Sequence, residues 1–225
     1  MIAPPAGGWL LAVDTALRER ATVVAAAPDG RVLERWEGSE AVDRLLIAEL
    51  RRLFRRPGPL LGVLAGIGPG SFTGLRVGVA ACLGAAHARD CPLRTVPSLL
   101  ITATTVDPGP FSLLVVHPAG RGAHHAQEFH AGEDGWIPTA PAWLAPRGEA
   151  PPADCGGRGR VVLRGDVEPA WRASAAGRSA PQRHPVDRAL ARLAARTWRG
   201  AARWADGDRD LQLDYGAARP GSPWS

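Results

Sequence analysis

A strand–turn–helix pattern between residues 60 and 88 restricts the possible folds more than any other part of the sequence. An apolar run, Leu60–Ala65, leads through a glycine-rich turn, GIGPGSFTG, into a stretch of small and apolar residues. An apolar run of this length is typical of a buried strand, and Ser71 or Thr73 is placed to cap the helix that we predict over Ser71–Ala88. A buried strand that leads into a helix is a building unit of α/β folds.

The residues before this unit predict three strands and a helix. Apolar runs and a turn signal, Pro28-Asp29-Gly30 between the second and third strands, favour an antiparallel meander. A helix follows, with acidic residues near its start and arginines near its end, and Pro57-Gly58-Pro59 stops it. The predicted strands are Gly8–Thr15, Ala21–Ala27 and Val32–Trp36, and the predicted helix is Ser39–Arg56.

The second half of the chain repeats the order βββαβα more faintly, with a proline-rich stretch, Pro138–Pro152, where the first helix would be. Two such units predict a duplicated α/β fold in which each half is a mixed sheet flanked by helices. We place the halves at residues 1–106 and 107–225, and the last helix, about 186–205, is a candidate for packing back against the first half. The predicted elements are strands at Phe111–His117, Ala123–His130, Trp136–Thr139 and Arg160–Leu163, and a helix at Val186–Ala205.

Composition excludes several classes of protein. The apolar runs are far shorter than the roughly 20 residues of a membrane-spanning helix, and the first residues lack the basic region of a secretory signal. Three cysteines without a C-x-x-C pair favour a reducing, cytoplasmic setting. The net charge of +5 would suit nucleic acid, but the basic residues are all arginine and are spread along the chain. A solvated basic surface is therefore favoured over autonomous RNA binding.

The helix after the glycine-rich turn carries a face of small residues. Each glycine inside a helix costs about 1 kcal/mol relative to alanine, so a closely packed neighbour must offset the cost. That neighbour is either the chain's own sheet or a helix of another protein, and a separate bulkier stripe is available for the sheet. The residues of the small face that we assign to partner binding are Gly74, Gly78, Ala81 and Ala85.

The predicted helix over Ser39–Arg56 has an apolar arc that is broader than packing on one sheet requires. We therefore expect part of this arc to be covered by a partner helix, so that the two helices form half of an intermolecular bundle. The stripe assigned to partner binding consists of Val42, Leu46, Leu50 and Leu53.

Enzymatic alternatives find less support in the sequence. An acid at the end of the first strand, Asp14, together with Gly165 and Asp166, could form a vestigial nucleotide site, but the residues after Asp14 lack the glycine and small polar donors of a phosphate turn. Asp14 as a structural cap remains an open alternative. A metal-dependent hydrolase is the other alternative, yet the six histidines form neither H-E-x-x-H nor a helical i, i+4 pair. No catalytic residue and no metal ligand is assigned.

The nine residues Gly68–Arg76, GPGSFTGLR, resemble the signature of the TsaB family, also called YeaZ. LLAVDTA at Leu10–Ala16 is similar to the opening strand of that family, and VLRGD at Val162–Asp166 is similar to a later strand and turn. The resemblance is strongest over the first 100 or so residues. It implies a duplicated actin-like fold (the ASKHA, RNase H-like type), which sugar kinases and heat-shock chaperones share.

The resemblance also implies a function. TsaB subunits are non-catalytic partners in the bacterial system that installs threonylcarbamoyladenosine on transfer RNA. They bind the catalytic homologue TsaD through helices of the first domain, and the ATPase TsaE joins them. We accordingly expect no cofactor on this chain, ATP and metal on the partner subunits, contact with tRNA through the complex, and a homodimer when the chain is alone. A metal- or nucleotide-dependent hydrolase of the same superfamily is the alternative.

The chain departs from the family pattern at several places. Gly38 stands where family members commonly carry a histidine, and the second half reads HPAGRG at His117–Gly122 in place of an Asp-Ala-Arg motif. Tyr215 and Arg219 have altered spacing relative to a Tyr-x-Arg ending. These departures concern the contacts of the second half rather than the fold.

Overall fold

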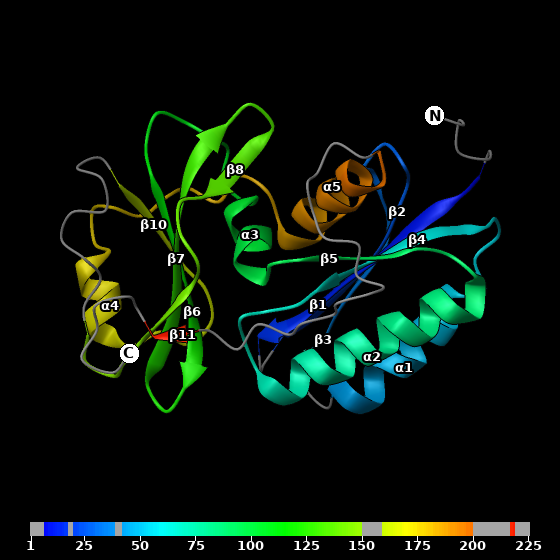
Figure 1. Ribbon diagram of the computed structural model, residues 1–225, viewed down its shortest axis with the longest axis horizontal. Coiled ribbons are helices and arrows are strands. Elements are labelled where there is room, and N and C mark those ends of the chain that lie inside the picture. Colours follow the sequence, from blue (N-terminus) through cyan, green and yellow to red (C-terminus); the bar gives the residue numbers. More distant parts are fainter. Residues whose placement is uncertain (1–6, 18–19, 39–41, 150–158, 200–216, 219–225) are drawn as a thin grey trace.

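The structure has two lobes, each built on one β-sheet (Figure 1). It is a computed structural model that describes residues 7–17, 20–38, 42–149, 159–199 and 217–218. The first half of the chain forms β1 (Trp9–Leu17), β2 (Arg20–Ala26), β3 (Val32–Gly38), α1 (Val42–Leu53), β4 (Leu60–Gly66), α2 (Phe72–Arg89), β5 (Leu93–Val96) and α3 (Ser98–Ala103). The second half forms β6 (Leu113–Gly120), β7 (Ala123–Gly132), β8 (Gly135–Pro138), β9 (Trp143–Ala145), β10 (Arg160–Leu163), α4 (Pro169–Ser174), α5 (Val186–Trp198) and β11 (Ala217–Ala218).

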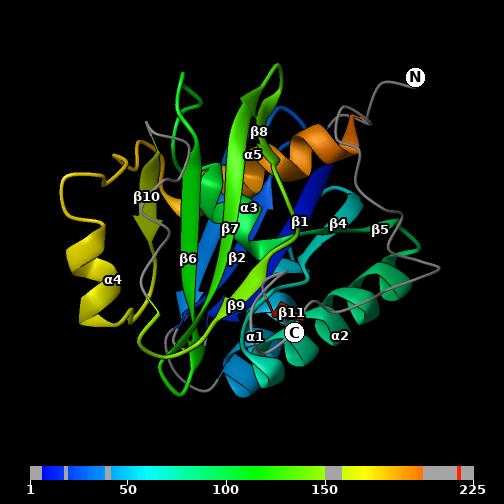
Figure 2. The same cartoon turned by 60° about the vertical axis from the view of Figure 1, so that its left-hand side comes forward.

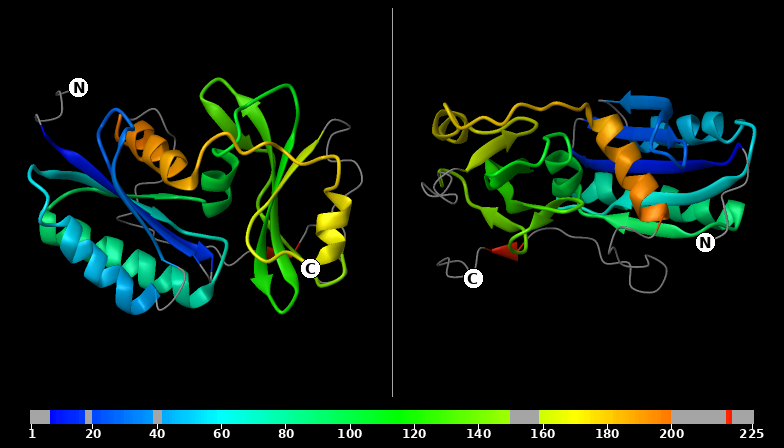
Figure 3. Two further views of the ribbon diagram at one scale, coloured as in Figure 1. Left: turned by 180° about the vertical axis from the view of Figure 1, so that it is seen from behind. Right: turned by 90° about the horizontal axis from the view of Figure 1, so that it is seen from above.

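The first sheet has the strand order β3-β2-β1-β4-β5, in which β1 is antiparallel to β2 and parallel to β4. α1 and α2 cover one face of this sheet, and α5 covers the other (Figures 1 and 3). β1 is buried along its whole length because it is a central strand with helices on both sides, which explains its continuous apolar sequence. The predicted order βββαβα is confirmed here, and β5 and α3 are additional short elements that the sequence pattern did not predict.

The second sheet repeats the central pairing of the first. β6 is antiparallel to β7 and parallel to β10, as β1 is to β2 and β4. Its strand order is β10-β6-β7-β9-β11, and β8 pairs with β7 (Figure 2). In the proline-rich stretch, the described residues up to 149 contain the short strand β9 instead of a helix. The duplicated α/β fold is therefore confirmed, with the second copy lacking a described counterpart of α1.

The final long helix joins the two halves physically. α5 follows the second sheet in the chain but packs against β1 and β2 of the first sheet. It ends at Trp198, and residues 200–205 of the predicted helix lie outside the described part of the chain. Within the described part, no helix combines the length and hydropathy that spanning a bilayer would need.

Three apolar cores fill the described part of the molecule. The largest joins the lobes, because Leu190 of α5, Leu10 of β1 and Val115 of β6 belong to the same buried cluster. α3 lies between the two sheets and contributes to this cluster (Figure 1). A second core lies between the first sheet and helices α1 and α2, and a third lies between the second sheet and α4. The shared core makes the relative position of the lobes a property of side-chain packing.

Candidate functional site

The start of α2 is anchored to the end of β1. Ser71 is the N-cap residue, and its hydroxyl oxygen accepts a hydrogen bond from the Gly74 N–H at 3.3 Å. The Ser71 N–H in turn donates to the Ala16 carbonyl at 2.7 Å. Of the two predicted caps, Ser71 or Thr73, the structure therefore uses Ser71.

Asp14 ties the glycine-rich turn to β1 from inside the protein. Its Oδ1 accepts hydrogen bonds from the Ser98 hydroxyl at 2.8 Å and from the Ala16 N–H at 3.3 Å. The Ser98 hydroxyl oxygen also accepts from the Gly68 N–H at 3.1 Å, which links the turn to the same network. Burial raises the pKa of the Asp14 carboxyl, opposed by the Ser98 hydrogen bond and by the positive charge of Arg164. The contacts of Asp14 therefore support a structural role for this residue, which the sequence left open beside a role in a nucleotide site.

The small-residue face of α2 packs within the chain, so the expectation that this face is free for a partner is wrong. A Cβ on Gly78 would lie 2.1 Å from Thr15 Oγ1, and one on Gly74 would lie 2.3 Å from the Thr15 carbonyl oxygen. The Thr15 hydroxyl also donates to the Gly74 carbonyl at 2.7 Å. Ala85 is buried in the core beneath α1 and α2, and Ala81 packs against the same core. The neighbour that offsets the cost of the helical glycines is therefore β1 of this chain.

The apolar stripe of α1 is likewise used inside the molecule. Leu46, Leu50 and Leu53 are buried in the core that α1 and α2 share with the first sheet. The expectation that these leucines are surplus to the chain's own interior is wrong, because two adjacent helices on one sheet bury a wider arc than a single helix does. Val42 begins α1, but its side chain lies outside the described part.

A different set of apolar side chains on the same two helices is open to solvent. Leu45 and Ile47 on α1 are 45% and 42% exposed, and Phe72 at the start of α2 is 53% exposed. On α2, Ala80 and Gly84 are also exposed. A Cβ added to Gly84 would point into open space, because apart from its own helix no atom lies within 4 Å of it. We call these five residues the outer helix surface. Figure 2 shows α1 and α2 side by side at the edge of the molecule.

A cleft of about 1190 Å³ lies between the lobes. It brings together the first turn of α2, the hairpin turn between β6 and β7, and the segment that follows β10. Gly165 and Asp166 line this cleft, as a nucleotide-type site would require, but its described lining does not include Asp14. The predicted constellation of Asp14, Gly165 and Asp166 is therefore divided between the cleft and the buried network beside it.

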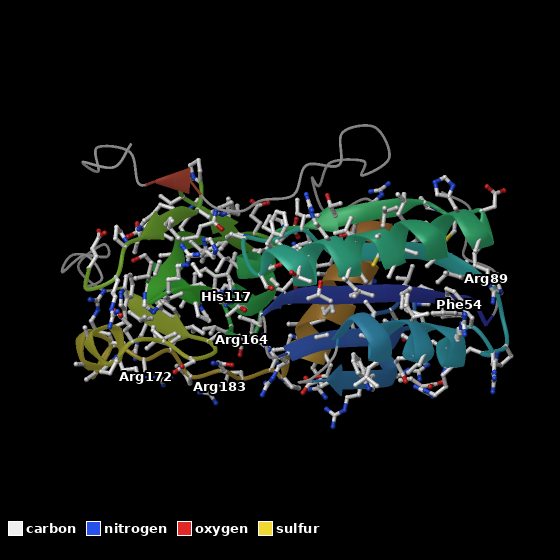
Figure 4. The ribbon with its side chains drawn as sticks, turned by 90° about the horizontal axis from the view of Figure 1, so that it is seen from below. Phe54, Arg89, His117, Arg164, Arg172 and Arg183 are labelled. Carbon is white, nitrogen blue, oxygen red and sulfur yellow. The ribbon has the colours of Figure 1, made fainter. Side chains whose placement is uncertain are left out.

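Arg164 is a residue of the cleft that the sequence-based assignment missed. It is only 8% exposed and lines the cleft, and Figure 4 places it with His117 between the lobes. Burial lowers the pKa of the Arg164 guanidinium, and the nearby carboxylate of Asp14 opposes this effect. The motif VLRGD contains Arg164, but its burial could not be inferred from the motif alone.

The histidines of the second sheet are mostly buried and serve separate contacts. His117 Nε2 lies 2.8 Å from Thr102 Oγ1, whereas His124 Nε2 accepts from the Glu168 N–H at 3.1 Å. Burial lowers the pKa of His117 well below its usual value, and the positive charges of Arg164 and His125 act in the same direction. Among the described residues, no three His, Cys, Asp or Glu side chains are grouped so that they could hold a metal ion.

Comparison with known proteins gives a family match and many structural matches, among them two that align over most of the chain with TM-scores above 0.6. The family model described as "TsaD: tRNA N6-adenosine threonylcarbamoyltransferase" matches residues 45–133. YeaZ from Pseudomonas aeruginosa has a TM-score of 0.64 and 17% sequence identity, covering 92% of this chain and 99% of that one. An uncharacterized protein with similarity to peptidase YeaZ from Pseudomonas aeruginosa has a TM-score of 0.63 and 19% identity, covering 92% and 100%. No curated protein matches the sequence.

These findings show that the chain has the YeaZ fold, which is the duplicated actin-like fold expected from the sequence. They also support the resemblance to the TsaB (YeaZ) family that was found in GPGSFTGLR. The family-model match begins within α1 and includes all of α2, so it covers the outer helix surface.

Proposed function

We propose that this chain is a TsaB-type partner subunit that binds and activates a TsaD-type transferase in the threonylcarbamoyladenosine modification of tRNA. A TsaE-type ATPase joins the pair, and tRNA is contacted through the complex. The chain requires no cofactor of its own, and ATP and metal belong to the partner subunits. It acts in the cytoplasm and forms a homodimer when its partners are absent.

The fold and the family match support this proposal from two directions. The chain shares the whole YeaZ fold, with 92% of its length aligned. The family model that matches residues 45–133 describes a tRNA-modifying transferase. A chain that matches the transferase family model over residues 45–133 and has the whole YeaZ fold fits a partner of the enzyme.

The observation that carries the proposal is the position of the exposed apolar side chains. Four large apolar side chains in the described part of the chain are clearly exposed, and three of them, Leu45, Ile47 and Phe72, lie on α1 and α2. Exposed small residues, Ala80 and Gly84, would let a partner helix approach α2 closely. This is the pair of helices on which the family resemblance predicts the partner interface.

Burial of these side chains provides a driving force of useful size. Covering a large apolar side chain contributes about 1.5–3 kcal/mol before the costs of association are subtracted. Leu45, Ile47 and Phe72 are already about half covered, so each gains only about half of this value, and contacts outside this surface must contribute to the interaction as well. The internal leucines of α1 contribute indirectly, because they hold the two helices in place.

The partner surface can be tested with a double variant, Ala80→Arg with Gly84→Arg. Both positions are exposed, so two arginines should leave the fold intact and obstruct a partner helix. In light scattering with a TsaD-type homologue, wild type should form the heterodimer and the variant should lose it. Ala173→Arg, at an exposed position of α4, is the matched control and should bind as wild type does. Undiminished binding by the double variant would contradict the proposed surface.

The non-catalytic role needs a separate reconstitution. The chain alone should modify no tRNA, and activity should appear when a TsaD-type subunit, a TsaE-type ATPase, ATP and the other substrates are combined with it. Omission of this chain should reduce the activity of the mixture. Modification or hydrolysis by the purified chain alone would instead favour the alternative of a superfamily hydrolase.

A further inference from the structure

We propose that the solvent-facing side of α5 binds the phosphate backbone of RNA through a row of four arginines. The identity of this RNA as a tRNA rests on the proposed function, and the inference adds a direct contact between this chain and that substrate. The residues, which we call the arginine row, are Arg188, Arg192, Arg196 and the C-cap residue Arg199.

The helical repeat gathers these arginines on one side of α5. At about 100° per residue the four positions fall within an arc of about 80°, and they extend over about 16 Å along the helix axis. Every other residue of α5 is buried, apart from the partly exposed Trp198. The basic residues are spread along the sequence, but the fold thus forms one side of a helix almost entirely from arginine.

The arginine row lacks the acidic partners that an arginine of α1 has. Arg52 on α1 pairs with both Glu34 and Glu49. By contrast, no guanidinium of the arginine row forms an ion pair with a carboxylate in the described part of the chain. Like charges four residues apart on a helix disfavour each other, so an anion bound along the row would relieve a repulsion that the chain itself leaves in place.

Position in the helix accounts for only part of the row. The helix dipole favours cations in the last turn, where Arg196 and Arg199 lie, but not near the start, where Arg188 lies. Two of the four arginines, Arg188 and Arg192, are therefore not explained by the stability of α5.

The acidic side chains around the arginine row do not neutralise it. Asp187 is buried, and its carboxylate binds Arg35 at 3.1 Å. The acidic residues 133–134 belong to the turn between β7 and β8, whose Gly135 lies next to the Arg196 guanidinium. The other three arginines are exposed and form the open part of the row.

The turn between β2 and β3 also lies against α5. A Cβ on Gly30 would be 3.5 Å from the Arg192 Cα. This turn carries the exposed residues Asp29 and Arg31, and the Asp29 carboxylate accepts the Arg31 N–H at 2.9 Å. Because it adds one charge of each sign, the turn leaves the positive balance of the surface unchanged.

The chemistry of the arginine row favours RNA over other anionic partners. The planar fork of arginine matches phosphate oxygens, and a nucleic-acid strand carries a phosphate at every nucleotide, so a row of this length can meet several of them. A helix that binds a lipid surface needs an exposed apolar side, whereas the apolar side of α5 is buried in the core that joins the lobes.

The place of α5 is compatible with a complex. α5 covers the face of the first sheet opposite to α1 and α2 (Figures 1 and 3). A partner on the outer helix surface would therefore leave the arginine row open for the RNA.

Fluorescence anisotropy with a labelled tRNA can test the row, both on the full chain alone and on its mixture with a TsaD-type homologue. The test variant combines Arg188→Gln, Arg192→Gln and Arg199→Gln, and at low salt it should bind at least about tenfold more weakly than wild type in both samples. The slope of log Kd against log salt concentration should fall by about two to three, about one for each lost phosphate contact. The melting temperature should not fall, because repulsion within the helix is removed.

The matched control removes three charges from exposed positions of the second lobe, with Arg121→Gln, Arg147→Gln and Arg160→Gln. It should bind tRNA within about threefold of wild type, because attraction between distant charges is largely screened. An equal loss of binding by the control would overturn the inference, since net charge alone would then explain the effect. Arg192→Glu, a single charge reversal in the row, should weaken binding as well and serves if the triple variant does not fold.

Light scattering on the same mixtures separates this inference from the proposed function. If no heterodimer forms but wild type binds tRNA through the arginine row, the partner function is contradicted and the inference stands. Absence of tRNA binding by wild type in both samples, undiminished binding by the row variants, or competition by poly-glutamate as strong as by unlabelled tRNA would overturn it. Binding to phosphatidylserine vesicles that needs the row, without binding to tRNA, would overturn it too and would favour a membrane partner.

Discussion

The two lobes have the same central strand pairing but very different coverage. The first sheet is covered by α1 and α2 on one face and by α5 on the other, whereas the described part of the second sheet has only the short α4 on its outer face. β1 is buried throughout, while β6 becomes partly exposed towards its end at Gly120. The helices of the first lobe hold the candidate partner surface, and the less covered second lobe supplies Arg164 to the cleft.

This difference shows how the two halves of a duplicated fold can keep the same strand pairing and yet carry different binding surfaces. Pairing of the strands is retained in both copies because it satisfies the backbone hydrogen bonds of each sheet. The helices are free to differ, since a helix that covers one sheet can come from either half of the chain, as α5 does. We therefore expect stability to be shared between the lobes and binding surfaces to be specific to one of them.

The strongest test of shared stability is Leu190→Ala on α5. Leu190 is buried in the core that joins the lobes, and truncation of such a leucine typically costs about 2–5 kcal/mol. Denaturant unfolding followed by tryptophan fluorescence should show one transition, shifted to lower denaturant, because both lobes lose contacts. Two separate transitions would show that the lobes unfold independently and would contradict the expectation that they share their stability.

The packing of the first lobe can be tested with two glycines of α2. Gly78→Ala should destabilise the protein by about 1–3 kcal/mol, because the added methyl group would meet Thr15. Gly84→Ala should stabilise it by up to about 1 kcal/mol, because the site is open and alanine is the better helix former. Thermal unfolding of both variants measures the difference. Equal effects would mean that the two faces of α2 are not distinguished as the structure describes.

The second lobe should be the source of a pH dependence that involves His117. Its pKa is lowered from 6.5 in the folded state, so the unfolded state binds more protons as the pH falls through 6.5. Stability should therefore decrease towards lower pH, by at most about 1.4 kcal/mol per pH unit for one histidine. Melting curves between about pH 7.5 and 5.5 should show a smaller decrease for His117→Gln than for wild type.

The matched control for this measurement is His130→Gln, an exposed position on β7 of the same sheet. If His117→Gln retains the full dependence on pH, protonation of His117 does not limit stability and the second lobe is not the sensitive region.

The sequence by itself determined most of the longer strands, the main turns and the α/β class. Continuous apolar runs predicted the central strands β1, β4 and β6, because buried strands must be apolar on both faces. The glycine-rich turn predicted the start of α2 to within one residue, and GPGSFTGLR pointed to the family whose fold the chain has. These features depend on local geometry and can therefore be read from neighbouring residues.

Only the tertiary structure decided what covers each face. Helical periodicity indicated that Gly74, Gly78 and Ala85 share a side of α2, but periodicity does not say whether that side meets a sheet, a partner or water. The answer depends on contacts between distant residues, such as Thr15 with Gly78. The same holds for Asp14, which meets a hydroxyl 84 residues away at Ser98, and for the burial of Arg164 at the cleft. Such features arise because the free energy of a side chain depends on its neighbours in space. Those neighbours are often far away in the sequence, so nearby residues do not reveal them.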